Sequence, residues 1–273
     1  MHYLQLTIAV ANDETRELLI AALAEQGIEG FEEAEEALKA FVAEDAYQAD
    51  AIAAVLEGFG LSAAIEKIAP TNWNAQWEAD FEPVVVDDFC TIRAHFHQLP
   101  IHTQHDIVIT PKMSFGTGHH ATTRLMVEQM EHIHFADKRV LDFGTGTGIL
   151  AILAEQLGAS EVIAIDNDVW SFDNAQENVQ LNHCRAIQVS MDDIEQLDTQ
   201  HPFDIILANI NRHILLAYMN RMYALLKKDT ILLMSGLLVE DENIVSAAAI
   251  EAGFRIEQVA TRNNWITILC RKD

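Results

Sequence analysis

Apolar and polar residues follow two different periods along the chain. From Arg139 onward, apolar runs of strand length alternate with amphipathic stretches of ten or more residues. This alternation predicts a doubly wound, Rossmann-like α/β sheet of parallel strands with helices on both faces and an antiparallel end. The expected strands begin at Arg139 and Val162 and cover 186–189, 203–210 and 231–235, the helices cover 169–181, 214–226 and 240–252, and a final hairpin pairs 254–259 with 265–270.

The first 70 residues have a different order of elements. A strand over 3–10 precedes a helix that Asn12 or Asp13 caps and Gly27 ends, and then come strands over 31–36 and 38–43, a helix over 46–59 and a strand over 63–68. The order β-α-β-β-α-β predicts a small α+β domain of the ferredoxin-like type. No catalytic constellation occurs in it, so we expect it to serve recognition.

These patterns divide the chain into three parts. We expect a ferredoxin-like substrate-recognition domain over residues 1–69, a linker helix over 70–82 and a larger α/β domain over 83–273. Trp73 and Trp77 lie four residues apart in the linker and would share one helical face.

Charge and cysteine content narrow the class of partner. The chain carries 42 acidic and 17 basic side chains, a net charge of −25, which repels nucleic acid and attracts basic proteins. The first 70 residues hold 14 acids and 3 bases, although a solvated surface that only favours solubility would also explain this excess. No apolar run is long enough to span a membrane and no signal-type core begins the chain, so we expect a cytoplasmic monomer. Cys90, Cys184 and Cys270 lie far apart, so we expect reduced thiols and no metal.

The glycine loop after the first strand of the α/β domain indicates the ligand. Gly144, Gly146 and Gly148 form G-x-G-x-G, which is not the dinucleotide pattern because residue 149 is isoleucine. Asp166 ends the next strand, where an acid can accept hydrogen bonds from ribose hydroxyls. A nucleoside without phosphates but with a methionine tail, S-adenosylmethionine, fits this combination.

Two further acids extend the predicted donor site. Asp142, just before the loop, is placed to hold either the loop or the ammonium group of the donor's tail. Asp193, after the third strand, could reach the adenine amino group.

Asn209 is the candidate catalytic residue. It lies at the carboxyl end of the fourth strand and resembles the asparagine that opens the Asn-Pro-Pro-aromatic signature of methyltransferases acting on exocyclic and amide nitrogens. An asparagine oxygen and the next backbone carbonyl can hold an amine with its lone pair directed at a methyl group. Ile210-Asn211 replaces the two prolines, which favours a flexible aliphatic amine over a flat base or amide. A merely polar strand end is the plainer interpretation.

A loop dense in glycine, threonine and histidine precedes the first helix of the α/β domain. Phe115 and Thr117 belong to it as candidate donor-binding residues, because glycines let backbone approach a ligand and threonine hydroxyls donate and accept hydrogen bonds. His119 and His120 either shape this loop, which we favour, or accept a proton.

Phe115-Gly116-Thr117-Gly118-His119-His120-Ala121-Thr122-Thr123 resembles the Phe-Gly-Thr-Gly-x-His-x-Thr-Thr loop of the ribosomal protein L-eleven methyltransferases. The stretches 142–150 and 208–210 are also similar to that family. The resemblance implies a class I methyltransferase domain behind a small docking domain. It also implies methylation of lysine ε-amines and the N-terminal α-amine of ribosomal protein L-eleven.

By position, the family's donor-binding residues fall on Thr123, Gly144, Asp166 and Asn209. Two departures lie elsewhere: Ala121 stands where many members have proline, and 167–170 replaces the usual Asp-x-Asp-Pro. Methyl transfer to a glutamine amide, a nucleobase or a small molecule is the alternative, as is a non-catalytic module that only binds S-adenosylmethionine.

Overall fold

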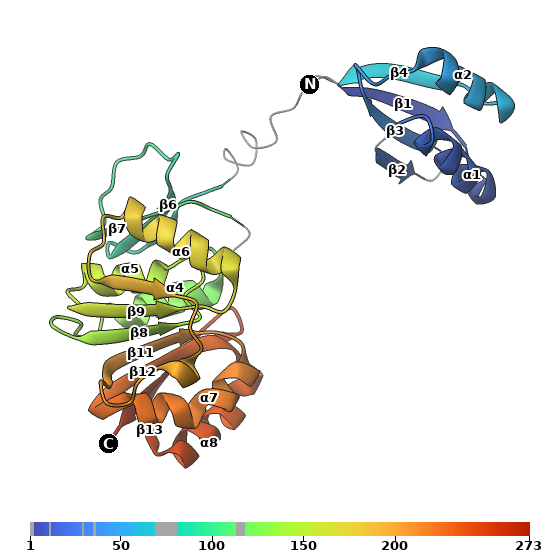
Figure 1. Ribbon diagram of the computed structural model, residues 1–273. Helices are drawn as coiled ribbons and strands as arrows, with labels where there is room; N and C mark the ends of the chain where they lie inside the picture. The colour runs from blue at the N-terminus through green and yellow to red at the C-terminus, as the bar shows by residue number, and fades with distance from the viewer. Residues whose placement is uncertain (1–2, 11, 29, 35–36, 69–80, 113–117) are drawn as a thin grey trace. The chain divides into compact units, whose positions relative to one another are not determined.

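The computed structural model describes residues 3–10, 12–28, 30–34, 37–68, 81–112 and 118–273. The described residues form two compact units, which divide between Asp80 and Phe81 (Figure 1). The expected linker helix with Trp73 and Trp77 lies, except for its last two residues, outside the described residues.

The N-terminal unit is a four-stranded antiparallel sheet with two helices. Its strand order is β2-β3-β1-β4, the arrangement of a ferredoxin-like fold, which confirms that expectation. The elements are β1 (Tyr3–Ala9), α1 (Asp13–Ala24), β2 (Gly30–Ala34), β3 (Ala37–Ala43), α2 (Ala49–Gly58) and β4 (Ala63–Ile68).

One apolar core holds the N-terminal unit together. Alternate strand residues such as Leu6, Ile8 and Leu38 share a buried cluster with Leu19 of α1 and Ile52 of α2. Because side chains alternate between the two faces of a strand, both helices cover the same face of the sheet. The Asn12 side chain caps α1 by accepting a hydrogen bond from the Thr15 N–H at 2.8 Å, one of the two caps expected.

The C-terminal unit is built on a mixed sheet of strand order β10-β9-β8-β11-β12-β14-β13. The strands from β10 to β12 are parallel and the last two are antiparallel, as the sequence predicts. Its elements are β8 (Arg139–Phe143), α5 (Ile149–Gln156), β9 (Glu161–Ile165), α6 (Val169–Leu181), β10 (Ile187–Ser190), β11 (Phe203–Asn209), α7 (Arg212–Leu225), β12 (Leu226–Leu238), α8 (Glu242–Ala252), β13 (Phe254–Arg262) and β14 (Trp265–Lys272), with short 3-10 turns η1 (Ile194–Gln196) and η2 (Val239–Asp241).

A smaller sheet and one more helix complete this unit. β5 (Val84–Val86) pairs antiparallel with β6 (Cys90–Ala94), which pairs parallel with β7 (His105–Ile109). The helix α4 (Ala121–Met130) follows the undescribed residues 113–117. The expected hairpin of β5 and β6 is confirmed.

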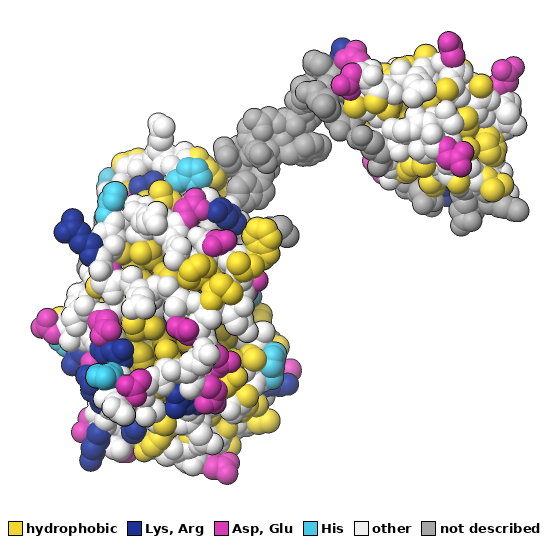
Figure 2. All heavy atoms as spheres, viewed as in Figure 1, with side chains coloured by type: hydrophobic (Ala, Val, Ile, Leu, Met, Phe, Trp, Pro, Cys, Tyr) yellow, Lys and Arg dark blue, Asp and Glu magenta, His cyan; other side chains and the backbone are white. Residues whose placement is uncertain are grey.

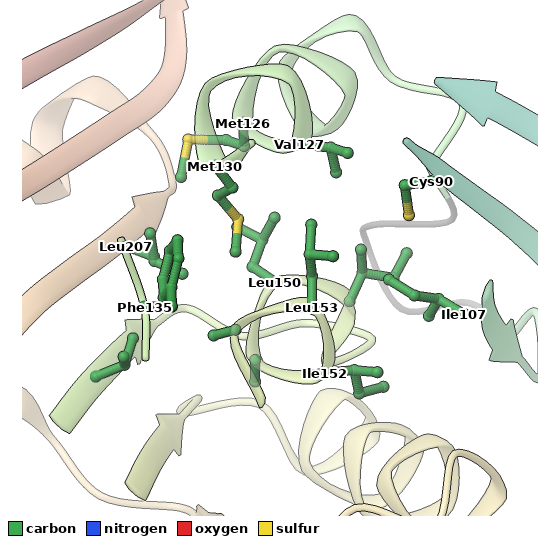
Figure 3. Packing of buried hydrophobic residues seen from close by; sticks show 14 of the residues in the cluster. Cys90, Ile107, Met126, Val127, Met130, Phe135, Leu150, Ile152, Leu153 and Leu207 are labelled. Atoms are coloured by element: carbon green, nitrogen blue, oxygen red, sulfur yellow. The ribbon is translucent and has the colours of Figure 1, made fainter. Parts of the chain in front are cut away.

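Both faces of the large sheet are buried. Consecutive residues of β11 alternate between two cores: Ile205 and Leu207 join the core under α4 and α5, while Ile206 and Ala208 join the core under α7 and α8. Figure 3 shows the first core, where methionines of α4 meet leucines of α5 above Leu207. Burial on both faces explains why these strands read as continuous apolar runs.

The structure corrects one predicted strand. The sequence indicates a strand over 231–235 that stops before Gly236, but β12 runs from Leu226 to Leu238. Its pairing with β14 is irregular between Met234 and Leu237, and Gly236 has a φ of +85°. A glycine in the left-handed region marks a bulge here and does not end the strand.

Replacing Leu207 by alanine should lower the free energy of unfolding by about 3 kcal/mol, because Leu207 is fully buried in the central strand. Ile250→Ala is the matched control, since that side chain is 60% exposed on α8 and should cost less than about 0.5 kcal/mol. Denaturant unfolding of both variants measures this difference. Equal losses would show that the two-core arrangement does not govern stability.

Candidate functional site

A cavity of about 580 Å³ opens at the carboxyl ends of the parallel strands. This is where doubly wound sheets bind ligands, because the loops that follow the strands converge there. Six of the residues predicted from the sequence line it: Thr123, Gly144, Gly146, Asp166, Asp193 and Asn209. Phe115 and Thr117 lie outside the described residues.

The glycine loop forms one wall of the cavity. The N–H groups of Gly144 and Thr145 both donate to the Ile165 carbonyl at the end of β9, at 2.9 and 3.0 Å. Gly144 has a φ of +75°, and a Cβ there would lie 2.2 Å from Ile210 Cγ2. The loop therefore has room for glycine alone at this position, and its backbone faces the cavity.

Asp166 links the glycine loop to the start of α6. Its Oδ2 accepts a hydrogen bond from the Gly146 N–H at 2.9 Å, and its Oδ1 accepts one from the Asp168 N–H at 3.1 Å. Asp168 in turn caps α6 through the Ser171 N–H at 2.8 Å, so the helix begins at Val169 despite the unusual residues before it. Each carboxylate oxygen of Asp166 keeps a second lone pair for a ligand hydroxyl.

Asp193 has a comparable place after β10. It caps η1 by accepting a hydrogen bond from the Glu195 N–H at 2.9 Å, and it lines the cavity beside Asp192 and Ile194. Its carboxylate therefore has a fixed backbone position at the same end of the cavity as Asp166.

Asp142 lies beneath the loop, fully buried, and is not among the described residues that line the cavity. The Thr145 hydroxyl donates to its Oδ2 at 2.6 Å, while Oδ1 has no hydrogen-bond partner. Burial raises the pKa of Asp142 to about 7; the Thr145 hydroxyl opposes this rise and the charge of Asp166 adds to it. Of the two roles expected for Asp142, the structure supports holding the loop.

Asn209 ends β11 with its oxygen buried. Asn209 Oδ1 has no hydrogen-bond partner, and Nδ2 approaches the Thr123 hydroxyl of α4 at 3.4 Å. A buried acceptor without a donor costs free energy in the ligand-free protein, which indicates that a ligand supplies the donor. The Ile210 carbonyl lies directly over Gly236, where a Cβ would be 2.3 Å from its oxygen.

The two histidines of the loop have different surroundings. His120 caps α4, accepting from the Thr122 N–H at 3.3 Å, and lines the cavity edge-on to Trp265 at 4.5 Å between ring centroids. Burial lowers the pKa of His120, which favours its neutral form. His119 instead bonds to the Glu82 carbonyl at 2.8 Å and packs on the ring of Phe81. Both contacts fit the favoured interpretation that the histidines shape the loop.

Sequence reasoning missed part of the cavity wall. Trp265, Phe143, His213 and Tyr218 line it, yet each reads in the sequence as an ordinary strand or helix residue. Trp265 reaches the site only because the β13–β14 hairpin returns to the carboxyl end of the sheet. Among the described residues, no group of His, Cys, Asp and Glu could hold a metal ion.

Comparison with known proteins places this geometry in a family context. A family model described as "Ribosomal protein L11 methyltransferase (PrmA)" matches residues 3–273. The chain is 42% identical over 270 residues to a protein of Porphyromonas gingivalis named ribosomal protein L11 methyltransferase, covering 97% of this chain and 92% of that one. A protein of the same name from Phocaeicola vulgatus is 34% identical over 276 residues, covering 98% of both chains.

A solved structure agrees with these relatives. The crystal structure of ribosomal protein L11 methylase from Lactobacillus delbrueckii subsp. bulgaricus superposes with a TM-score of 0.65 at 28% identity, covering 71% of this chain and all of that one. The similarity supports a class I methyltransferase fold for the C-terminal unit.

Removing the charge of Asp142 should change how stability depends on pH. The pKa of this carboxyl is about 7 in the folded chain and returns to about 3.8 on unfolding, so the folded state holds the proton more tightly. This contribution favours folding at low pH and is lost as the pH rises from about 4 to about 7. Asp142→Asn escapes the loss, so its unfolding free energy relative to the wild type should rise by roughly 2 kcal/mol between about pH 5 and pH 8.

Denaturant titrations of the ligand-free proteins at the two pH values measure this change. A difference between the two proteins that stays constant over the range would show that Asp142 titrates alike in the folded and unfolded chains.

Proposed function

The chain belongs to the ribosomal protein L11 methyltransferase family, and we propose from this premise that it transfers methyl groups from S-adenosylmethionine to amino groups of ribosomal protein L11. The acceptors are lysine ε-amines and the N-terminal α-amine. The observation that carries the proposal is the buried, unpartnered oxygen of Asn209 in the wall of the cavity.

The residues of the cavity fit the methyl donor. The glycine cradle at Gly144 and Gly146 leaves backbone exposed to a ligand, and Asp166 has lone pairs for two ribose hydroxyls. Asp193 is placed for the adenine amino group, and Thr123 and Asn209 lie where the methionine portion ends. The bound donor supplies an electrophilic methyl group on a positively charged sulfur.

The protein's own part is to hold a neutral amine. A lysine ammonium has a pKa near 10.4 and no lone pair, so the acceptor must lose a proton before it reacts. Asn209 Oδ1 and the Ile210 carbonyl accept hydrogen bonds from the amine's N–H groups, which leaves its lone pair directed into the cavity. Removal from water disfavours the charged amine, and solvent takes the proton.

His120 and Trp265 form the wall beside this position. Their rings meet edge to face at 4.5 Å, and the lowered pKa of His120 keeps it uncharged at neutral pH. An uncharged aromatic wall does not repel an arriving ammonium group and packs well against an aliphatic side chain.

The N-terminal unit is the proposed recognition domain, over residues 1–69, with residues 70–82 as the linker and 83–273 as the methyltransferase domain. All three bases of the first 70 residues are engaged: Arg16 is buried, Lys39 pairs with Glu32, and Lys67 pairs with Glu44. Exposed acids without a cation beside them, among the described residues, are Glu25, Asp45, Asp50, Glu57 and Glu66. Figure 2 shows acidic side chains over the visible face of this unit. Such a surface attracts a lysine-rich protein.

We also propose that the protein acts as a cytoplasmic monomer without direct contact to nucleic acid. The net charge of −25 disfavours binding to phosphate backbones. In the described part of the chain, no helix is long and apolar enough to cross a membrane.

Asn209→Ala should lower kcat for methylation of L11 by roughly 100-fold and change donor affinity far less, since it removes the acceptor that orients the amine. Asn211→Ala is the matched control, because Asn211 lines the same cavity but makes no side-chain cap hydrogen bond. Transfer of radiolabelled methyl groups to purified L11 gives kcat, and calorimetry gives donor affinity.

Mass spectrometry of the product then identifies the methylated atoms. Labelled amines support the proposal, and labelled glutamine or nucleotide would replace it with another methyltransferase activity. Donor binding without any transfer would indicate a binding module. Unchanged kcat in Asn209→Ala would remove the proposed role of Asn209.

Reversing two acids of the N-terminal unit should weaken substrate binding. The double change Asp45→Lys and Glu57→Lys takes the charge of the first 70 residues from −11 to −7, since each reversal adds two charges. We expect KM for L11 to rise about fivefold at low salt and the difference to shrink at high salt. The control, Glu240→Lys with Glu251→Lys, reverses two exposed acids of the C-terminal unit. An equal effect of both pairs would assign the attraction to overall charge.

A further inference from the structure

Three asparagines four residues apart lie on one face of α6, beside the smaller sheet (Figure 1). Asn174 and Asn178 are fully buried, and Asn182 is partly exposed. Within the sequence they look like ordinary polar helix residues, and the catalytic site described above does not use them.

These asparagines complete the edge of β7. The Asn182 amide donates to the Val108 carbonyl at 2.6 Å and accepts from the Val108 N–H at 2.9 Å. The Thr110 N–H donates to Asn178 Oδ1 at 2.8 Å, and Asn174 Nδ2 donates to the Thr110 carbonyl at 3.0 Å. An edge strand leaves such backbone groups unpaired, and carboxamides replace the missing neighbour because they carry the same donor and acceptor as a peptide.

Asn178 differs from the other two in a second contact. Its Nδ2 donates to the Thr147 carbonyl at 2.8 Å, and Thr147 lies between Gly146 and Gly148 in the loop that lines the donor cavity. One buried carboxamide thus joins the glycine loop to the backbone just past β7.

The segment that Asn178 holds leads to the acceptor side of the site. Beyond Thr110 the chain continues through Lys112 toward His120 and Thr123, which line the cavity. Glu177, next to Asn178 on α6, accepts hydrogen bonds from the Thr110 hydroxyl at 2.9 Å and from Lys112 Nζ. The same helix begins at Val169, directly after the loop that carries Asp166.

We propose that Asn178 is a positioning residue for methyl transfer: it fixes the glycine loop of the donor site against the segment that enters the acceptor side. The assignment rests on the function proposed above. It does not make Asn178 catalytic, since the side chain is buried behind the loop and touches neither donor nor amine. Its effect passes through the Thr147 and Thr110 backbone groups.

Asn182 supplies a control from the same helix face. Asn182→Ala removes both bonds to Val108 and one to the Asn178 carbonyl at 2.7 Å, yet it leaves the glycine loop untouched. A purely structural role would make Asn182→Ala at least as harmful to function as Asn178→Ala. Positioning makes the two variants differ in donor affinity even when they lose similar stability.

The test uses calorimetric titration of the full chain with S-adenosylhomocysteine, alongside chemical unfolding. We expect Asn178→Ala to raise the Kd about tenfold and Asn182→Ala to leave it within twofold. Asn178→Ser, which keeps a small polar group for one of the two backbone partners, should also raise the Kd and serves if the alanine variant does not fold. Equal Kd changes in the Asn178 and Asn182 variants, or unchanged Kd in the Asn178 variants, would overturn the proposal.

Amide hydrogen exchange gives a second readout that a structural role would not move. In the wild type, S-adenosylhomocysteine should slow exchange of the Thr110 amide, because an ordered glycine loop holds the Asn178 side chain in place. This slowing should persist in Asn182→Ala and disappear in the Asn178 variants; persistence in the latter would contradict the link. Neither readout needs the acceptor protein, so a wrong acceptor would not affect the result, whereas failure of the wild type to bind the analogue would count against the proposed function itself.

Discussion

The position of Ile210 between two glycines is the constraint on which the site depends. A Cβ at Gly144 would lie 2.2 Å from its side chain, and a Cβ at Gly236 would lie 2.3 Å from its carbonyl oxygen. The loops after β8 and β12 therefore close on the residue that follows β11. This close approach brings the donor-binding loop and the acceptor-holding carbonyl to the same place, and any larger side chain at either glycine would separate them.

Several polar groups are buried around this contact, each with a stated compensation or a stated cost. Thr145 satisfies one oxygen of Asp142, and Asp166 receives two backbone N–H groups. The remaining oxygen of Asp142 and the oxygen of Asn209 have no partner. Unsatisfied acceptors concentrate at functional sites because the fold tolerates their cost where a ligand or a proton provides the missing donor. The fold thus invests stability in the part of the molecule that does the chemistry.

Charge and chemistry are separated along the chain. The acidic excess of the N-terminal unit lies on a sheet with no catalytic constellation, while the C-terminal unit carries the cavity. A surface that attracts a basic protein over a distance and a site that needs an uncharged amine make opposite demands on electrostatics. Placing them in different units lets each be met without weakening the other.

The sequence by itself determined the architecture and the donor half of the site. Strand and helix periods predicted both folds, and G-x-G-x-G with Asp166 predicted a donor without phosphates, because loop spacing and strand ends are local properties of the chain. Asn209 was also identified, since it ends an apolar strand. Tertiary structure alone showed that its oxygen is buried without a partner.

The remaining features depend on contacts between distant segments, which no local pattern records. Trp265 comes to the cavity through a hairpin at the C-terminus, and Asn178 joins Thr110 and Thr147 across 68 and 31 residues. Gly236, expected to end a strand, instead lies within β12 beneath Ile210. Hydrophobic period and residue type fix which elements form, but side-chain packing between elements decides which residues meet.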